Sequence, residues 1–235
     1  MPRTYLKLAA AVIAGGIAVA ACGSVKLGAA AIVGNQRITA TQLGTEVTSY
    51  NAEFNSYRGK IQQQFSASQT PQQVLGWLVS FQVGDRLAQR YGITITPAQQ
   101  QRAQQSVSNA LRAQDPGATL GELAAAIGLA PDMIPSFDRY EAIQTAVADR
   151  LDGGKAPASD SSSAQALSNQ FATSQCRAAK SLAIQISPQF GELDYNLNDF
   201  AAYSVVPASP TLSRAQPSPS PSASPTSAPQ LTPPC

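Results

Sequence analysis

The sequence between Ala40 and Leu151 marks four helix starts with the same pattern. In each, a threonine is followed three positions later by a glutamine or glutamate, the spacing of a capping box. In a capping box these two side chains satisfy backbone amides at the helix start that otherwise have no partner. The pairs are Thr39 and Gln42, Thr70 and Gln73, Thr96 and Gln99, and Thr119 and Glu122. This repeated pattern predicts a mainly helical domain.

The first predicted helix carries apolar residues at alternating steps of three and four positions. That spacing places them on one face, which must pack against a partner. The face is more typical of a hydrophobic core than of a ligand site. Its residues are Leu43, Val47, Tyr50, Phe54, Tyr57 and Ile61.

The second predicted helix, residues 71–90, is apolar around most of its circumference and includes Trp77 and Phe81. An all-round apolar helix belongs at the centre of a bundle, so we expect Trp77 to be a buried core residue. Gly76 and Gly84 each cost about 1 kcal/mol in a helix relative to alanine, which suggests close approach of neighbouring helices. Together with the apolar face of the first helix, Trp77 and Phe81 form the core of the predicted binding module.

Three further helices follow in the sequence. The one after Thr96 is polar and rich in glutamine, which places it on the surface. A short helix covers residues 120–127, and a longer one ends near Leu151, with Pro131 and Pro135 confining its start to the residues before Phe137.

Strand patterns occur only near the two ends of this region. Ala31-Ile32-Val33 and Arg37-Ile38 flank a Gly34-Asn35-Gln36 turn, and Leu182, Ile184 and Ile186 alternate with other residues. Because isolated short strands are marginal in water, we expect the two segments to pair. The predicted fold is therefore mainly α, a bundle of about five to six helices closed by a small β pairing of N-terminal and C-terminal segments.

Residues 1–21 have the pattern of an export signal, with Arg3 and Lys7 ahead of an apolar run too short for a comfortable membrane span. The run ends in Val19-Ala20-Ala21-Cys22, which resembles a bacterial lipobox. That resemblance implies lipidation of Cys22 and a protein anchored at the extracytoplasmic face of the bacterial cell membrane. The alternative is a soluble secreted protein in which Cys22 is an ordinary thiol.

Export leaves Cys176 and Cys235 in a compartment where disulfides persist. They can pair with each other, although a free thiol or an intermolecular bridge at Cys235 is nearly as plausible. Residues 207–235 hold nine of the 17 prolines and predict a disordered Pro/Ser-rich tail, which leaves residues 22–206 as the folded domain. The stretch 153–163, which is rich in glycine and serine, predicts a flexible insert.

The chain contains no histidine, which excludes imidazole-based catalysis and His-ligated zinc. The 16 Lys and Arg and 14 Asp and Glu balance once Arg3 and Lys7 are removed, so the mature chain has no electrostatic signature of nucleic-acid binding. The carboxylates Asp132, Asp138, Glu141, Asp149 and Asp152 are interpreted as a solvated helix face, and Glu192 and Asp194 supply too few oxygens for a cation. We expect no catalytic residue, no metal site and no cofactor.

The lipobox, the segment Ala30-Ala31-Ile32-Val33-Gly34-Asn35-Gln36-Arg37-Ile38-Thr39 and the helix that follows it resemble the N-terminal chaperone domain of SurA-type peptidyl-prolyl isomerases. Tyr91-Gly92-Ile93-Thr94-Ile95-Thr96-Pro97 is similar to a turn of the same family, and residues 186–194 are similar to the closing motif of exported lipoproteins with this domain. The resemblance covers about residues 29–195. The parvulin domain, which carries the family's isomerase activity and depends on histidines, has no counterpart here.

What the resemblance implies is the chaperone part alone, a helical module that binds unfolded or extended exported polypeptides without catalysis. The partners expected are therefore exported polypeptides and, through the lipid anchor, the membrane. The alternative is a structural or assembly lipoprotein of the envelope that binds one dedicated protein partner. A general chaperone requires an exposed apolar groove, whereas a dedicated binder requires a compact anchor cluster.

Overall fold

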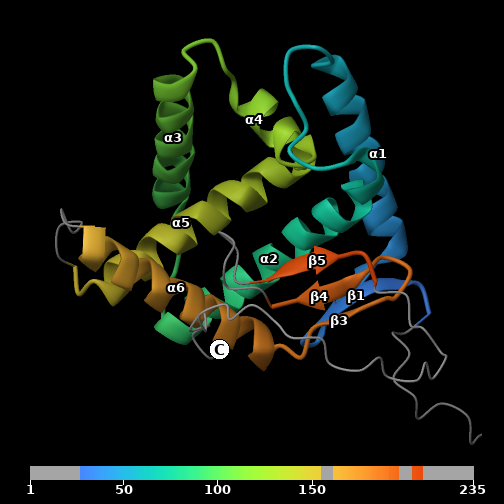
Figure 1. Ribbon diagram of the computed structural model, residues 1–235. Helices are drawn as coiled ribbons and strands as arrows, with labels where there is room; N and C mark the ends of the chain where they lie inside the picture. The colour runs from blue at the N-terminus through green and yellow to red at the C-terminus, as the bar shows by residue number, and fades with distance from the viewer. Residues whose placement is uncertain (1–26, 155–160, 196–202, 209–235) are drawn as a thin grey trace, which may run out of the picture.

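The computed structural model describes residues 27–154, 161–195 and 203–208. Within them the chain is mainly helical, with two small antiparallel sheets formed by segments from the N-terminal and C-terminal ends (Figure 1). The predicted fold class is therefore confirmed. The predicted signal segment, Cys22, Cys235 and nearly all of the predicted tail lie outside the described residues.

Six α-helices are present in the described part of the chain, and α2 contacts α1, α5 and α6. Figure 1 shows the two sheets beside each other near one end of α2, with α3 and α4 at the far side of the molecule. The helices are α1 (Ala40–Ser56), α2 (Thr70–Tyr91), α3 (Pro97–Gln114), α4 (Leu120–Ala126), α5 (Ile134–Leu151) and α6 (Ser161–Ser181).

Three of the four predicted capping threonines are correct. The Thr39 hydroxyl oxygen accepts a 3.0 Å hydrogen bond from the backbone N–H of Gln42 and caps α1. Full capping boxes open α3, at Thr96, and α4, at Thr119. These caps satisfy amides in the first turn and so define where each helix begins.

The fourth helix, α2, begins within one residue of the predicted position, but the predicted capping box of Thr70 and Gln73 is wrong. Thr70 is the buried first residue of α2, and its hydroxyl donates a 2.9 Å hydrogen bond to the carbonyl of Ala67. The capping box lies four residues earlier, between Ser66 and Gln69, and opens a short 3-10 turn (Ala67–Gln69). Because this turn continues directly into α2, the helix needs no separate side-chain cap.

The first sheet has the strand order β2-β1-β3, with β1 (Ala29–Val33) between β2 (Gln36–Thr39) and β3 (Gln185–Ile186). Both pairings are antiparallel, with Ala31 opposite Ile38 on one side and Ile186 on the other. The predicted pairing of the N-terminal and C-terminal segments is confirmed. The C-terminal strand is shorter than predicted, since Leu182 and Ile184 precede it in irregular backbone.

A second sheet, absent from the sequence analysis, pairs β4 (Glu192–Asp194) with β5 (Ser204–Val206). Gly191 precedes β4 at a φ of +125°, and a Cβ there would lie 2.2 Å from the backbone oxygen of Val206. Only glycine allows this approach. The sheet places Tyr203, which is 4% exposed, against the helices.

The core lies between α1, α2, α5, α6 and β1, and two predictions about it need correction. Helix α1 ends at Ser56, because the backbone of Tyr57 leaves helical geometry and Tyr57 is its C-cap residue. Ile61 therefore lies beyond the helix. Trp77 and Phe81 are half-buried instead of enclosed, because one face of α2 borders a pocket. Gly76 lines that pocket, and a Cβ at this position would have no neighbouring atom within 4 Å.

Helix α6 was not anticipated. It begins at Ser161, inside the stretch 153–163 interpreted as a flexible insert, of which residues 155–160 lie outside the described chain. Its first turns are polar, and its apolar contacts begin further along, at residues such as Phe171 and Ala178. Serine-rich starts suppress the periodic signal on which helix prediction depends.

Candidate functional site

A pocket of about 430 Å³ lies between α2, α5 and β5. We call it the α2–α5–β5 pocket. It is more apolar and larger than a second pocket on the opposite side of the α2–α5 contact, and Tyr140 borders both. The α2–α5–β5 pocket is lined by Gln72, Gln73, Gly76, Trp77, Ser80, Tyr140, Glu141, Gln144, Tyr203, Ser204 and Val205.

An aromatic cluster between α2 and α5 forms one wall of this pocket. The Trp77 ring meets Phe137 and Tyr140 edge-on, at centroid distances of 5.5 and 6.4 Å, and stacks near Phe81 at 6.1 Å. The indole Nε1–H of Trp77 donates a 2.9 Å hydrogen bond to the carbonyl of Ile127. Trp77 is therefore held in one orientation while part of its surface faces the pocket.

The carboxylate of Glu141 is the charged group among the described residues that line the pocket. Glu141 lies on α5, where its Oε1 accepts a 3.2 Å hydrogen bond from Gln144 Nε2. Burial raises the pKa of the Glu141 carboxyl above its ordinary value, and the charge of Asp138 raises it further. Among the described residues that line the pocket there is no lysine or arginine, so none of them neutralises Glu141.

Two buried oxygens of pocket-lining residues have no hydrogen-bond partner among the described residues. They are Gln72 Oε1 and the Tyr203 hydroxyl. Burial raises the pKa of Tyr203 well above its ordinary value, and the nearby Ser80 side chain opposes that rise. Tyr140 differs, since its hydroxyl accepts a 3.1 Å hydrogen bond from Gln175 Nε2 of α6. Buried polar atoms normally have partners, so the two unsatisfied oxygens are places where a ligand gains by donating a hydrogen bond.

Strand β5 forms the remaining side of the pocket, through Ser204 and Val205. Its pairing with β4 uses one edge only, and no strand of the described chain pairs with its other edge. An unpaired strand edge offers backbone N–H and C=O groups to an incoming extended segment.

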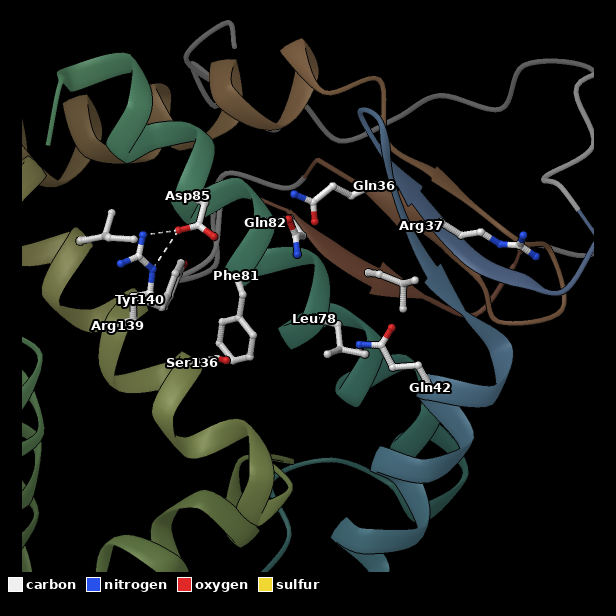
Figure 2. A pocket seen from close by; sticks show the side chains of 12 residues that line it. Gln36, Arg37, Gln42, Leu78, Phe81, Gln82, Asp85, Ser136, Arg139 and Tyr140 are labelled. Atoms are coloured by element: carbon white, nitrogen blue, oxygen red, sulfur yellow. Dashed lines mark hydrogen bonds and ion pairs between the residues drawn. The ribbon is translucent and has the colours of Figure 1, made fainter. Parts of the chain in front are cut away.

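The second pocket, of about 270 Å³, lies between β2, α1, α2 and α5. Figure 2 shows Phe81 pointing from α2 into it, and the ion pair of Asp85 and Arg139 at one end. The carboxylate oxygen of Asp85 and Nη2 of Arg139 are 2.9 Å apart, and both side chains are more than 40% exposed. Asp85 and Arg139 are thus already paired, and Arg37, which also lines this pocket, donates a hydrogen bond to the carbonyl of Leu27, which makes the second pocket the weaker candidate.

The residues predicted as the core of the binding module divide between core and pockets. Leu43 and Tyr50 are 1% and 0% exposed and serve the core, with Val47 and Phe54 packed partly buried beside them. Tyr57 follows the end of α1.

Of the predicted binding residues, Trp77 lines the α2–α5–β5 pocket and Phe81 lines the second pocket. Sequence analysis missed the pocket residues Glu141, Tyr203 and Val205. For Glu141, the sequence signal was its position directly after Tyr140 in an amphipathic helix.

The interpretation of Asp138 and Glu141 as part of a solvated helix face is wrong. Asp138 is 5% exposed, and its Oδ2 accepts a 2.9 Å hydrogen bond from Gln104 Nε2 of α3. Its Oδ1 is buried without a partner among the described residues. Burial raises the pKa of the Asp138 carboxyl, and the Gln104 hydrogen bond opposes that rise. The neighbouring helices α2 and α3 cover the face that sequence alone left open.

Cys176 lies fully buried in α6 and is disulfide-bonded. Its partner cysteine lies outside the described residues, so the pairing of Cys176 with Cys235 stays a prediction. Lipidation of Cys22 stays a prediction for the same reason.

In residues 27–154, 161–195 and 203–208, no group of three or more His, Cys, Asp or Glu side chains is placed to hold a metal ion. None of the helices described there is both long enough and apolar enough to cross a membrane.

Comparison with known proteins adds no relative. The chain matches no protein-family model, no curated protein and no solved structure.

Proposed function

We propose that this protein is a membrane-anchored, chaperone-like lipoprotein that binds unfolded or extended exported polypeptides without catalysing a reaction. Its site is the α2–α5–β5 pocket. The observation that carries the proposal is that half-exposed Trp77 lines the same pocket as β5, a strand with one edge that no described strand pairs with. The lipobox-like sequence ending in Cys22 and the resemblance to SurA-type chaperone domains support it.

An extended polypeptide suits this site because both its backbone and its side chains have groups to contact there. Its backbone pairs with the free edge of β5, and every second side chain then points to the same side, as in any strand. That side is where Trp77, Tyr140 and Val205 offer apolar surface. Backbone pairing is independent of sequence, which is what a binder of many clients needs.

The test is suppression of aggregation of chemically unfolded proteins by the full chain carrying Cys22→Ser, which leaves the protein without its lipid. We expect suppression of several unrelated clients at micromolar concentrations. Gly76→Leu fills the pocket and should abolish suppression, because the space within 4 Å of that Cβ position is empty.

Gly44→Leu is the matched control. Gly44 lies in the exposed part of α1, and its Cβ position is also free of neighbours within 4 Å. This variant should suppress aggregation as well as its parent. Suppression of no client would contradict the proposal and favour the structural or assembly lipoprotein that binds one dedicated partner. Equal loss of aggregation suppression in both glycine variants would show that the α2–α5–β5 pocket is not the binding site.

The membrane anchor has its own test. Cys22→Ser should move the protein from the membrane fraction to the soluble fraction and leave its helical circular dichroism unchanged. Continued pelleting with membranes would contradict the lipid anchor.

A further inference from the structure

We infer that the α2–α5–β5 pocket receives a basic side chain of the bound polypeptide, an arginine in preference to a lysine. This inference rests on the proposed function and adds the chemistry of the client that the site selects. It explains why a carboxylate lies in a pocket wall that also contains the aromatic rings of Trp77, Tyr140 and Tyr203.

The polar atoms of the pocket call for a hydrogen-bond donor that carries positive charge. Glu141 supplies a carboxylate, and two buried oxygens, Gln72 Oε1 and the Tyr203 hydroxyl, have no hydrogen-bond partner among the described residues. An arginine guanidinium has five N–H donors in a fixed plane and no acceptor, which suits several acceptors at once. A lysine ammonium donates three hydrogen bonds from a single point, so it satisfies them less well.

The aromatic wall favours the same ligand. Trp77 and Tyr140 border the pocket, and a cation within about 6 Å of such a ring is attracted by the negative face of its π system. The attraction is larger where water is excluded. The stem of an arginine also packs against apolar surface while its charged end reaches the polar atoms.

The described part of the chain supplies no cation to this pocket. Arg139, the basic residue nearest in sequence on α5, faces the opposite pocket, where it pairs with Asp85 (Figure 2). Keeping Glu141 partly buried without an opposite charge has an energetic cost, as the raised pKa of its carboxyl indicates. A ligand that brings the positive charge recovers that cost on binding.

The experiment uses Trp77 as its probe, because it is the chain's only tryptophan and lies in the pocket wall. The full chain carrying Cys22→Ser is titrated with two short peptides of serine, threonine and valine that differ at the central position. One has arginine there and the other has citrulline, which has the same shape without the charge. We expect the arginine peptide to change Trp77 fluorescence and to bind at least about tenfold more tightly, a difference equal to about 1.4 kcal/mol.

Glu141→Gln keeps the size of the side chain and removes its charge, so it should reduce the preference for arginine to near unity. Asp149→Asn is the matched control on the same helix, since Asp149 is exposed and does not line the pocket. It should leave the preference unchanged. A lysine peptide should bind with intermediate affinity.

The outcomes separate this inference from the proposed function. Equal binding of the arginine and citrulline peptides overturns the inference that the pocket receives a basic side chain. An unchanged preference for arginine in Glu141→Gln overturns it as well. Either result leaves the chaperone proposal standing. Binding of neither peptide, together with no suppression of client aggregation, overturns both. Equal loss of preference in Glu141→Gln and Asp149→Asn would show general electrostatic attraction and also overturn the inference.

Discussion

The backbone at Gly84 lies so close to the ring of Tyr140 that a Cβ at position 84 would stand 2.6 Å from Tyr140 Cδ2. This contact is where α2 and α5 approach each other, and it positions the ring that borders both pockets. The sequence analysis predicted a close approach at both Gly76 and Gly84. The structure confirms it at Gly84 and contradicts it at Gly76, whose Cβ position is free of neighbours within 4 Å.

Alanine at these two glycines should therefore have opposite effects. Gly84→Ala forces the Tyr140 ring to move, and overpacking of this kind costs about 1 to 3 kcal/mol, partly offset by about 1 kcal/mol of helix propensity. Gly76→Ala should gain that propensity without a clash. Urea unfolding followed by circular dichroism measures both, and destabilisation by both variants would contradict the spacing of α2 and α5.

Trp77 contributes through its hydrogen bond as well as its ring. Trp77→Phe keeps the aromatic contacts and loses the Nε1–H donor, but Gln73 Nε2 still donates a 3.0 Å hydrogen bond to the same Ile127 carbonyl. We expect a loss of about 1 kcal/mol in unfolding free energy. Trp77→Ala, which removes a half-buried ring, should cost about 3 kcal/mol, the lower end of the range for core aromatics.

A double variant tests the shared carbonyl. Adding Gln73→Met to Trp77→Phe removes both side-chain donors to Ile127, so the combined loss should exceed the sum of the two single losses. The measurement is urea unfolding by circular dichroism, since the fluorescent residue is gone. Strict additivity would show that the carbonyl does not depend on these donors.

The sequence predicted the elements whose signals are local, and it missed what depends on neighbours. Capping residues located α1, α3 and α4 because a cap acts within one helical turn. The pairing of β1 with β3 was also predictable, because two short apolar strands had no other partner in the sequence.

The candidate site was largely hidden from sequence for the opposite reason. Trp77 and Phe81 were recognised as apolar, yet nothing local shows that α2 has an open side. Glu141 has the sequence pattern of a surface carboxylate, and only the approach of α2 and β5 buries it. Tyr203 is separated from the pocket residues of α2 and α5 by about sixty positions or more, so no local pattern connects them.

The buried carboxyls Asp138 and Glu141 make stability depend on pH in an unusual direction. Burial raises the pKa of both, so the folded state favours their protonated forms. Their contribution to stability is full below the ordinary carboxyl values of 3.8 and 4.5, and it is lost as pH rises through the raised values. At neutral pH both groups destabilise the fold.

Neutral substitutes should remove that effect. Asp138→Asn and Glu141→Gln should each raise the melting temperature at pH 7 and flatten the pH dependence. Among the described residues, the groups that interact with them are Gln104 of α3, Tyr140 and Gln144 of α5 and each other, none of them basic. Asp85→Asn, which breaks the exposed pair with Arg139, should change stability by no more than about 1 kcal/mol. A lower melting temperature at pH 7 in both neutral variants would contradict this assignment.

The C-terminal strands should be part of the same folding unit as the helices. Ending the chain after Ser181 removes β3 from the edge of β1 and removes Tyr203, which is 4% exposed, from the core. Thermal unfolding of that variant under reducing conditions should begin at a clearly lower temperature. A chain ending after Ala208 keeps both contacts and should melt like the full chain under the same conditions. Equal melting of all three would contradict the role of β3.

The disulfide at Cys176 also tests the lipid anchor. The chain has only two other cysteines, Cys22 and Cys235. A thioether-linked lipid occupies the sulfur of Cys22, so a lipidated chain has only Cys235 left for an internal bridge. Peptide mapping of the non-reduced protein from membranes should therefore recover Cys176 linked to Cys235. By chain entropy, such a bridge stabilises the folded state by about 4 kcal/mol, which Cys235→Ser should remove. Recovery of Cys176 linked to Cys22 would contradict lipidation, and with it the membrane anchor.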